Sequence, residues 1–409
     1  MGEEFADVVI VGGGIAGLAT ALALKRVGIN GVLVLEKADE LRATGSALTL
    51  FPNAWRALNA LGVAHKLAPL YPPIQRGSVT LISSGVTLPL SVPGDNDGNG
   101  MGVRCVHRKA LLQALADELP SRTIRFGCHV ASIETLSDSS FALIRLGDGS
   151  SIKTKVLIGC DGVNSVVAQW LGLSAPVLAG RLAVRGLASY GGHGHKLGHE
   201  ALQFVGDGLK GGIVPVNDHE LYWFLTYKST PQEVELVGQP ELIRKSVAEK
   251  TAEKFPTKFS EIIRNTDLST LTLAQLKLRC PWDLIFRDLT RGNVAVAGDG
   301  MHPMTPDLGQ GGCSALEDAI FLGRNLGEAF QRNNFDGSSV EESLKKYARE
   351  RKWRAAGLIS ASYFSGWIQG HNGWFVQLVR DKLLSKIFYS RGVRSLDYDC
   401  GELPVVSSG

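Results

Sequence analysis

The sequence has 409 residues, of which 44% are hydrophobic and 20% are charged, and its formal net charge is +3. This length suits two or three domains with complete cores, and the composition is ordinary for a soluble globular protein. So small a net charge argues against a nucleic-acid-binding protein, and no uninterrupted apolar run reaches the roughly 18 residues of a membrane span. We therefore expect neither a nucleic-acid partner nor an integral membrane segment.

The six cysteines are scattered, without the spacing of a zinc site or a redox pair. They fit free thiols in a reducing compartment. The first predicted strand begins close to Met1, with no signal or transit segment before it. We expect a cytoplasmic protein, or an organellar one if a leader has been removed.

The chain opens with a strand, a glycine-rich turn, a helix, a second strand and an acid. Residues 8–11 form an apolar β-branched run, residues 18–24 are rich in Ala and Leu, and residues 32–35 form a second apolar run. Gly12, Gly14 and Gly17 supply the G-x-G-x-x-G pattern between them. In this context the pattern predicts a dinucleotide site rather than a plain glycine-rich turn.

Each part of that motif has a physical role. Gly12 permits the tight turn, Gly14 lets the backbone approach a pyrophosphate, and Gly17 lets the helix lie close to the strand. The helix N-terminus offers N–H groups and a positive dipole to the phosphates. Glu36 can accept both hydroxyls of an adenosine ribose and would repel a 2′-phosphate. We therefore expect FAD or NAD here rather than NADP.

Further along the chain, strand and helix patterns alternate between two kinds of region. The patterns predict a helix from Pro52 to about Leu61, a hairpin over 76–90, a polar loop over 93–100, a helix over 106–119 and strands over 123–159. Short strands over 177–230 indicate an antiparallel sheet, followed by helices over 232–265, strand over 270–287 and a buried strand over 293–299. From Cys313 to about Phe388 we expect helix, and in the last dozen residues a loose tail.

These patterns predict an α/β protein in which a Rossmann-like nucleotide domain is discontinuous. Its predicted parts are residues 1–75, 101–176 and 286–335. The antiparallel β-sheet substrate domain inserted between them comprises a hairpin at 76–100 and residues 177–285, and a C-terminal helical region with a tail occupies 336–409.

Two more motifs follow predicted strands. One reads Gly159-Cys-Asp-Gly-Val-Asn-Ser-Val-Val167, and the other is the stretch 297–319 with the pattern GD-xx-H-xxx-P-xx-GQG. Together with G-x-G-x-x-G they resemble the three fingerprints of the group A, single-component flavoprotein monooxygenases, whose prototype is para-hydroxybenzoate hydroxylase. The complete sequence of the third motif is similar to that of the plant salicylate-hydroxylase-like and zeaxanthin-epoxidase-like branch of this family.

This resemblance implies that the nucleotide domain binds FAD tightly and without a covalent bond. It implies that Asp299 contacts the ribityl chain, that Pro306 lies beside the isoalloxazine ring, and that the helix after the turn at 309–312 stabilises reduced flavin. The full set of implied cofactor contacts is Gly12, Gly14, Ile15, Ala16, Gly17, Glu36, Lys37, Arg42, Arg108, Val130, Asp161, Gly162, Gly298, Asp299, Pro306, Gly309, Gly311, Gly312 and Cys313.

The resemblance also implies NADPH or NADH as a transient reductant, because no second G-x-G-x-x-G exists. Asp161 and Gly162 match the family's DG motif, which serves both FAD and NADPH. The family's arginine shortly after that motif is absent, since Ala168 and Gln169 stand there. Either the reductant docks on a shared surface, or the chain needs no nicotinamide at all.

The activity implied is hydroxylation of a small phenolic or heteroaromatic substrate by O₂ through a flavin C4a-hydroperoxide, in a monomer or homodimer. Pro306 and Arg185 are the candidate catalytic residues, although Arg185 is equally a candidate surface arginine. An alkene epoxidase, a reductase or dehydrogenase of the same fold, and a binding protein without turnover remain alternatives. Halogenation is disfavoured, because W-x-W-x-I-P is absent.

Four other features have structural and functional interpretations. His193, His195 and His199 lie in a Gly-rich stretch without a completing carboxylate or cysteine pattern, so we predict a solvated loop and no metal site. For His302, packing and hydrogen bonding are favoured over catalysis. Tyr222, Trp223 and Phe224 alternate on a predicted strand, so some of them should face inward, and core packing is favoured over contact with a ligand. The amphipathic stretch 374–388 is expected to pack on the body, with a membrane-surface helix as the alternative.

Overall fold

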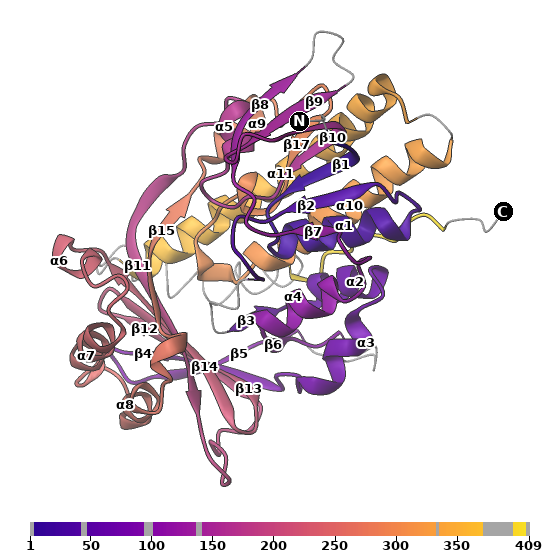
Figure 1. The fold of residues 1–409 in the computed structure, drawn as a ribbon. Coiled ribbons are helices and arrows are strands. Elements are labelled where there is room, and N and C mark those ends of the chain that lie inside the picture. Colours follow the sequence, from indigo (N-terminus) through magenta and orange to yellow (C-terminus); the bar gives the residue numbers. More distant parts are fainter. Residues whose placement is uncertain are drawn as a thin grey trace.

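In the computed structural model, two β-sheets lie side by side with helices around them (Figure 1). The structure describes residues 4–41, 47–93, 101–135, 141–332, 335–370 and 396–405. Two hydrophobic cores accompany the two sheets, a larger one around the nucleotide motifs and a smaller one beneath the second sheet.

The first sheet contains the predicted buried strands. Its main order is β16 (Thr290–Arg291), β17 (Val294–Val296), β10 (Ser151–Gly159), β1 (Glu4–Val11), β2 (Val32–Leu35) and β7 (Ile124–Arg125). The hairpin of β8 (Val130–Thr135) and β9 (Ala142–Leu146) joins it through β10. Strand β1 pairs in parallel with both β2 and β10, so the motifs that follow these strands meet at one edge.

Helices cover this sheet. Helix α1 (Ile15–Arg26) is buried continuously from Ile15 to Leu24, and α10 (Gly311–Gln331) packs along it. The others of this part are α2 (Pro52–Ala60), α3 (Ala64–Leu67), α4 (Arg108–Ala116), α5 (Val166–Trp170), α9 (Pro281–Phe286) and the long α11 (Gly337–Gly370), with short 3₁₀ turns η1 (Ala68–Leu70), η3 (Gly298–Gly300) and η4 (Pro306–Leu308). Among the described residues, no helix is both long and apolar enough to cross a membrane.

The second sheet has the order β15 (Thr272–Leu278), β11 (Val177–Ser189), β14 (Glu220–Lys228), β13 (Leu209–Asn217), β12 (Glu200–Gly206), β4 (Arg76–Leu81) and β5 (Thr87–Leu90). Helices α6 (Pro231–Val234), α7 (Pro240–Thr251) and α8 (Thr257–Arg264), with η2 (Leu268–Thr270), lie on its outer side (Figure 1). Strands β3 (Ala47–Leu50) and β6 (Arg104–His107) form a separate two-stranded ribbon. Each of them connects the two sheets along the chain, β3 between β2 and β4 and β6 between β5 and β7, and β6 contacts β13.

The predicted α/β fold class is confirmed, and several details differ from expectation. The inserted sheet is antiparallel except for the parallel pair of β4 and β12, because the hairpin enters from another part of the chain. Residues 281–286 form helix α9 where strand was expected, since Pro281 starts a helix. The helix expected from residue 106 begins at Arg108, because residues 104–107 pair with β3. The domain boundaries given above remain predictions.

The expectation of a loose tail in the last dozen residues is wrong for its described part, residues 398–405. Cys400 is buried, Leu403 packs on the core, and Arg324 Nη1 donates to the Cys400 carbonyl at 2.9 Å. These contacts depend on α10 and therefore leave no local pattern in the sequence. The amphipathic stretch 374–388 and Arg42 lie outside the described residues.

Candidate functional site

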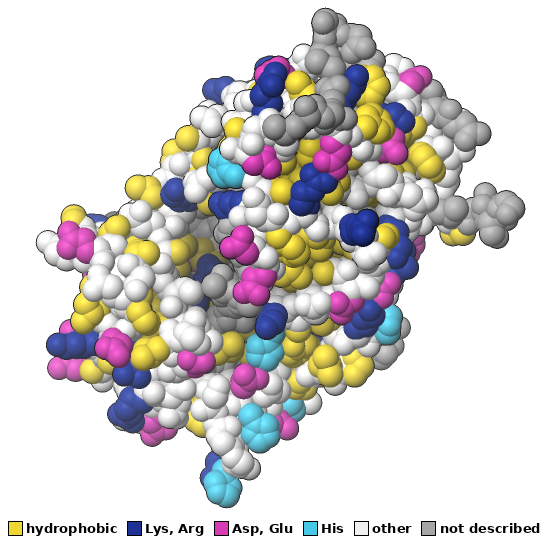
Figure 2. Space-filling model, viewed as in Figure 1, with side chains coloured by type: hydrophobic (Ala, Val, Ile, Leu, Met, Phe, Trp, Pro, Cys, Tyr) yellow, Lys and Arg dark blue, Asp and Glu magenta, His cyan; other side chains and the backbone are white. Residues whose placement is uncertain are grey.

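A cavity of about 540 Å³ lies where the first sheet meets the second. The glycine-rich turn, the ends of β2 and β10, the start of α10 and one face of the second sheet line it. The surface is hollowed between these two parts of the molecule (Figure 2). This is the edge where nucleotides bind in sheets of this kind, because the carboxyl ends of the strands open there.

The glycine-rich turn forms one wall of the cavity. Gly12 has a φ of +105°, and a Cβ there would overlap the Cys160 carbonyl, while a Cβ at Gly17 would overlap the Gly12 carbonyl. A Cβ at Gly14, by contrast, would meet no protein atom within 4 Å. Gly12 and Gly17 therefore hold the turn together, and Gly14 leaves open space for a ligand.

Two helix N-termini adjoin the cavity without side-chain caps. Gly14 precedes α1 and Gln310 precedes α10, and neither position has a capping hydrogen bond from its side chain. Uncapped N-termini carry unpaired N–H groups and a partial positive charge. The cavity can therefore accept phosphate groups or a developing negative charge.

Glu36 directly follows β2, at the position predicted to contact a ribose. Its carboxylate is buried, and Oε2 accepts from the backbone N–H of Gly13 at 2.7 Å while Oε1 accepts from Ala38 N–H at 2.9 Å. These two bonds fix the carboxylate against the glycine-rich turn. Lys37 and Val130 line the cavity nearby.

The second motif places Asp161 and Gly162 on the cavity wall. The Asp161 carboxylate accepts from Ser165 Oγ at 2.5 Å and from Val166 N–H at 2.7 Å, so it holds the start of α5. Burial raises the pKa of this carboxyl group, although these hydrogen bonds oppose the shift. Ala168 and Gln169, which replace the family's arginine, lie within α5 itself.

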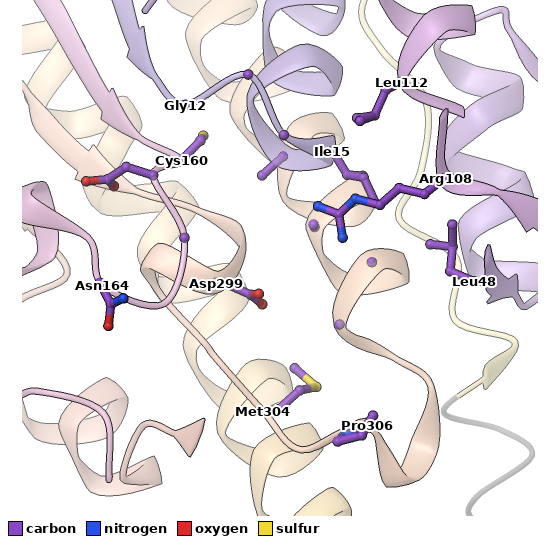
Figure 3. Close-up of a pocket in the computed structure, with 18 of the residues that line it drawn as sticks. Gly12, Ile15, Leu48, Arg108, Leu112, Cys160, Asn164, Asp299, Met304 and Pro306 are labelled. Carbon is purple, nitrogen blue, oxygen red and sulfur yellow. The ribbon is translucent and has the colours of Figure 1, made fainter. Parts of the chain in front are cut away.

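The third motif brings a carboxylate and a proline to the opposite side. Asp299 and Arg108 point into the open space from different elements, and Met304 and Pro306 lie on a lower wall (Figure 3). Gly298 has a φ of +56°, and a Cβ there would lie 2.6 Å from Ala16 Cβ. The tight backbone at Gly298 therefore sets where Asp299 projects.

A buried network of charges supports this motif from behind. Asp318 Oδ2 accepts from Gly298 N–H at 2.8 Å and lies 2.6 Å from His302 Nε2, and Asp318 Oδ1 accepts from Arg351 Nε at 2.7 Å. Burial raises the pKa of the Asp318 carboxyl group, but the adjacent His302 and Arg351 outweigh this effect and lower the pKa to about 2. His302 is buried in this network rather than exposed in the cavity, as its packing interpretation predicted.

The facing wall is the inner face of the second sheet. Arg185 from β11 and Tyr222, Phe224 and Thr226 from β14 line the cavity there. Arg185 has no ion-pair partner among the residues that the structure describes. Phe224 fits because Gly212 opposite it has no side chain, and a Cβ there would overlap the Phe224 ring. This wall offers one cation and an aromatic surface.

The structure brings most of the predicted site residues to this cavity. Those that line it are Gly12, Gly14, Ile15, Ala16, Glu36, Lys37, Arg108, Val130, Asp161, Gly162, Arg185, Asp299, Pro306, Gly309, Gly311 and Gly312. Gly17, Gly298 and Cys313 do not line it: Gly17 and Gly298 permit close backbone packing, and Cys313 is buried with its Sγ 3.7 Å from the Gly309 carbonyl. Arg42 is not described.

Sequence reasoning missed several lining residues. Leu48 and Thr49 come from β3, Leu112 from α4, and Ala183 and Thr226 from the second sheet. Alternation along β11 and β14 was a usable signal, because residues 183 and 185 share a face. No signal in the sequence indicated that β3 would reach the site.

In the Gly-rich stretch, His195 Nε2 lies 2.6 Å from the Asn217 carbonyl oxygen, and its Nδ1 accepts from Leu197 N–H. Burial lowers the pKa of His195. Among the described residues there is no group of three or more His, Cys, Asp or Glu side chains that could hold a metal ion.

The sheet topology, the glycine-rich turn and the acid at the end of β2 define a dinucleotide-binding enzyme fold. The model of the FAD binding domain family matches residues 5–362, and the chain belongs to that family as a group A FAD-dependent aromatic monooxygenase. The open position at Gly14, the fixed Glu36 and the two uncapped helices fit FAD.

Known proteins that are similar to this chain support the assignment to this family. Monooxygenase 2 from Arabidopsis thaliana is 42% identical, with 98% of this chain and 99% of the relative covered. An FAD-dependent urate hydroxylase from Mycolicibacterium vanbaalenii is 31% identical over 86% of each. The structure of Klebsiella pneumoniae HpxO complexed with FAD and uric acid superimposes with a TM-score of 0.82 at 24% identity, covering 98% of each chain.

Proposed function

We propose that this monooxygenase uses NADPH or NADH and O₂ to hydroxylate a small anionic aromatic substrate. The observation that carries the proposal is the facing wall of the cavity, where Arg185 lies beside Tyr222 and Phe224 and has no ion-pair partner within the described part of the chain. A half-buried arginine without a carboxylate partner favours a carboxylate, phenolate or urate-like anion. The aromatic side chains favour a flat ring beside that charge.

Each wall of the cavity has its own part in this proposal. Bound flavin supplies activation of O₂ for transfer of one oxygen atom. The turn at Gly14, together with Glu36, Arg108 and Asp299, would hold the nucleotide, and Arg185 would orient the substrate against the wall formed by Pro306. Enclosure between the two sheets would exclude water from the reacting atoms. We also propose that the protein works in the cytoplasm, as a monomer or homodimer.

The relatives support the substrate class. One relative is named a urate hydroxylase, and the solved HpxO structure contains uric acid, a heteroaromatic anion. The facing wall of this chain offers a cation beside aromatic rings, which suits a flat anion of that kind. The assay described below is designed to identify the substrate within this class.

The test is an assay of the FAD-loaded protein under ¹⁸O₂, with NADPH and NADH compared and a panel of aromatic acids, phenols and urate set beside neutral analogues. We expect one ¹⁸O atom in the product. Arg185→Gln should raise KM for anionic substrates by about tenfold or more and change it little for neutral ones, because it removes a charge-assisted contact. Nucleotide oxidation without labelled product would indicate a reductase, and a labelled epoxide would indicate the alkene activity instead.

A further inference from the structure

A buried carboxylate joins the wall formed by Pro306 to the second sheet. Asp307 follows Pro306 in η4, and its side chain is fully buried. Arg181 from β11 donates two hydrogen bonds to this carboxylate, from Nη1 to Oδ1 at 3.0 Å and from Nη2 to Oδ2 at 2.5 Å. Lys210 from β13 donates to the Asp307 carbonyl oxygen at 2.9 Å. We call Arg181, Lys210 and Asp307 the clamp.

The clamp lies on the same face of the sheet as the cavity wall. Residues 181, 183 and 185 alternate along β11, and Ala183 and Arg185 both line the cavity. Lys210 lies opposite Thr226, which lies opposite Ala183, so these three form one row across the sheet. Arg185 and Phe224 form the next row. The clamp therefore fixes η4 one step away from the residues that face the substrate.

Helix α11 also packs against the clamp. Helix α11 packs on η4 and on β13, and its C-terminal end reaches the second sheet (Figure 1). At Gly366 it passes so close to Arg181 that a Cβ would overlap the guanidinium group. Arg181 is thus confined between Asp307 and α11, and only glycine at position 366 leaves it room.

The charges make this contact specific. Side chains of Arg181 and Lys210 are 13% and 6% exposed, and the only carboxylate within ion-pair distance of either among the described residues is Asp307. Burial lowers the pKa of Lys210, and the nearby charge of Asp307 opposes that shift. An ion pair buried in this way holds a defined geometry, because losing one partner leaves an uncompensated charge.

We propose that the clamp is a positioning device that fixes the distance across the substrate cavity, between Pro306 and the sheet face that carries Arg185 and Phe224. This inference rests on the proposed function for its meaning in catalysis. A substrate held by Arg185 stays at reacting distance from the Pro306 wall only while η4 and β11 keep their spacing. Loosening the clamp lets reducing equivalents go to hydrogen peroxide instead of product.

The test compares Gly366→Ala with Gly357→Ala in the FAD-loaded protein. Both changes lie in α11 and replace glycine by a better helix former, but a Cβ at Gly357 meets no atom within 4 Å. In Gly366→Ala we expect the product formed per NAD(P)H oxidised to fall by about tenfold or more, because small displacements at a reacting centre are costly. Gly357→Ala should match the parent.

Hydrogen–deuterium exchange gives a readout that needs no turnover. Peptides covering residues 303–310 and 181–187 should exchange faster in Gly366→Ala, by about tenfold, and peptides from α1 should not. Arg181→Gln should do the same, whereas Arg145→Gln, which breaks an exposed pair with Glu134, should not. The double variant Arg181→Gln with Gly366→Ala should be no worse than either single variant, because both act through Arg181.

The outcomes separate the two proposals. The clamp proposal would be overturned if Gly366→Ala had the same hydrogen–deuterium exchange rates and the same yield of product per NAD(P)H oxidised as Gly357→Ala. Additive effects of the two changes in the double variant would also overturn it. If the parent protein oxygenates no aromatic compound, the proposed function fails. The exchange experiment would then still decide whether the clamp holds η4 to the sheet.

Discussion

At the scale of single residues, Gly14 and Gly17 are both glycines for steric reasons, but for opposite ones. The space beside Gly14 contains no protein atom within 4 Å and belongs to the cavity, whereas the space beside Gly17 is filled by the Gly12 carbonyl. A side chain at Gly14 therefore competes with the ligand, and a side chain at Gly17 competes with the fold. This difference can be measured.

We expect Gly14→Val to fold but to lose FAD, and Gly17→Val to lose both the cofactor and stability. Valine at Gly14 should leave the Tm of the apoprotein within about 2–4 °C of the parent, because a mutational cost of about 1 kcal/mol or less moves the Tm of a large domain little. Flavin absorbance per mole of protein and melting of the apoprotein provide the measurements. Yellow protein from Gly14→Val would remove this turn from the FAD site.

Residue types and spacing predicted that the residues of three separate motifs lie together. The glycine-rich turn, Glu36, Asp161 and Asp299 come to one cavity because each follows a parallel strand, and parallel strands end at the same edge. Asp318 was not predicted as a supporting residue, although it bonds Gly298. Its partners are spread over the chain, and no local pattern records them.

At the scale of elements, α1 and α10 approach closely because two glycines face α1. Gly323 and Gly327, four residues apart on α10, meet Ala23 of α1 and Val27 at its C-terminal cap, which are also four residues apart. A Cβ at either glycine would lie 2.7 Å from the facing Cβ. The cavity depends on this packing, because the N-termini of both helices adjoin it.

Gly327→Ala should destabilise the protein by about 1–3 kcal/mol, because the added methyl group overpacks the contact with Val27. Urea unfolding of the apoprotein measures this free energy. Gly357→Ala, with open space at its Cβ, is the matched control and should be neutral or stabilising by up to about 1 kcal/mol. Equal unfolding free energies for the two variants would mean that the helices separate at little cost.

Elements with strong local patterns were predicted, and those defined by distant pairing were not. The hydrophobic runs are sufficient to predict β1 and β2 as strands, and the Ala-Leu run is sufficient to predict α1 as a helix. Strand β6 was not predicted, and its last two residues were included in the helix predicted from residue 106, because only pairing with β3 makes this segment a strand. The parallel contact of β4 with β12 likewise joins segments about 120 residues apart, beyond the reach of turn signals.

At the scale of the whole molecule, α11 ties the two sheets to one another. Near its middle Arg351 is buried and binds Asp318 and Glu317, which belong to α10 behind the third motif. At its far end Gly366 confines Arg181 of the second sheet. One helix thus supports both the third motif and the wall formed by the second sheet, which no motif in its own sequence indicated.

Arg351→Gln should cost about 3–5 kcal/mol of unfolding free energy, because it removes a fully buried cation that binds both Asp318 and Glu317. Arg349→Gln, an exposed position on the same helix, should stay within about 0.5 kcal/mol of the parent. Urea unfolding of the apoproteins between pH 7 and pH 3 provides both numbers. FAD affinity should fall in Arg351→Gln alone, since Asp318 holds the backbone of Gly298 next to Asp299.

The pH dependence of that loss is set by Asp318. Its pKa in the folded protein is lowered to about 2 from an ordinary value of 3.8, chiefly by His302 and Arg351 against the opposing effect of burial. The stability that this shift contributes is fully present above about pH 4 and is lost as the pH falls toward 2. The difference between parent and Arg351→Gln should therefore be largest near neutral pH and shrink below pH 4. A difference that is constant from pH 7 to pH 3 would mean that Arg351 acts by packing alone and not through the charge of Asp318.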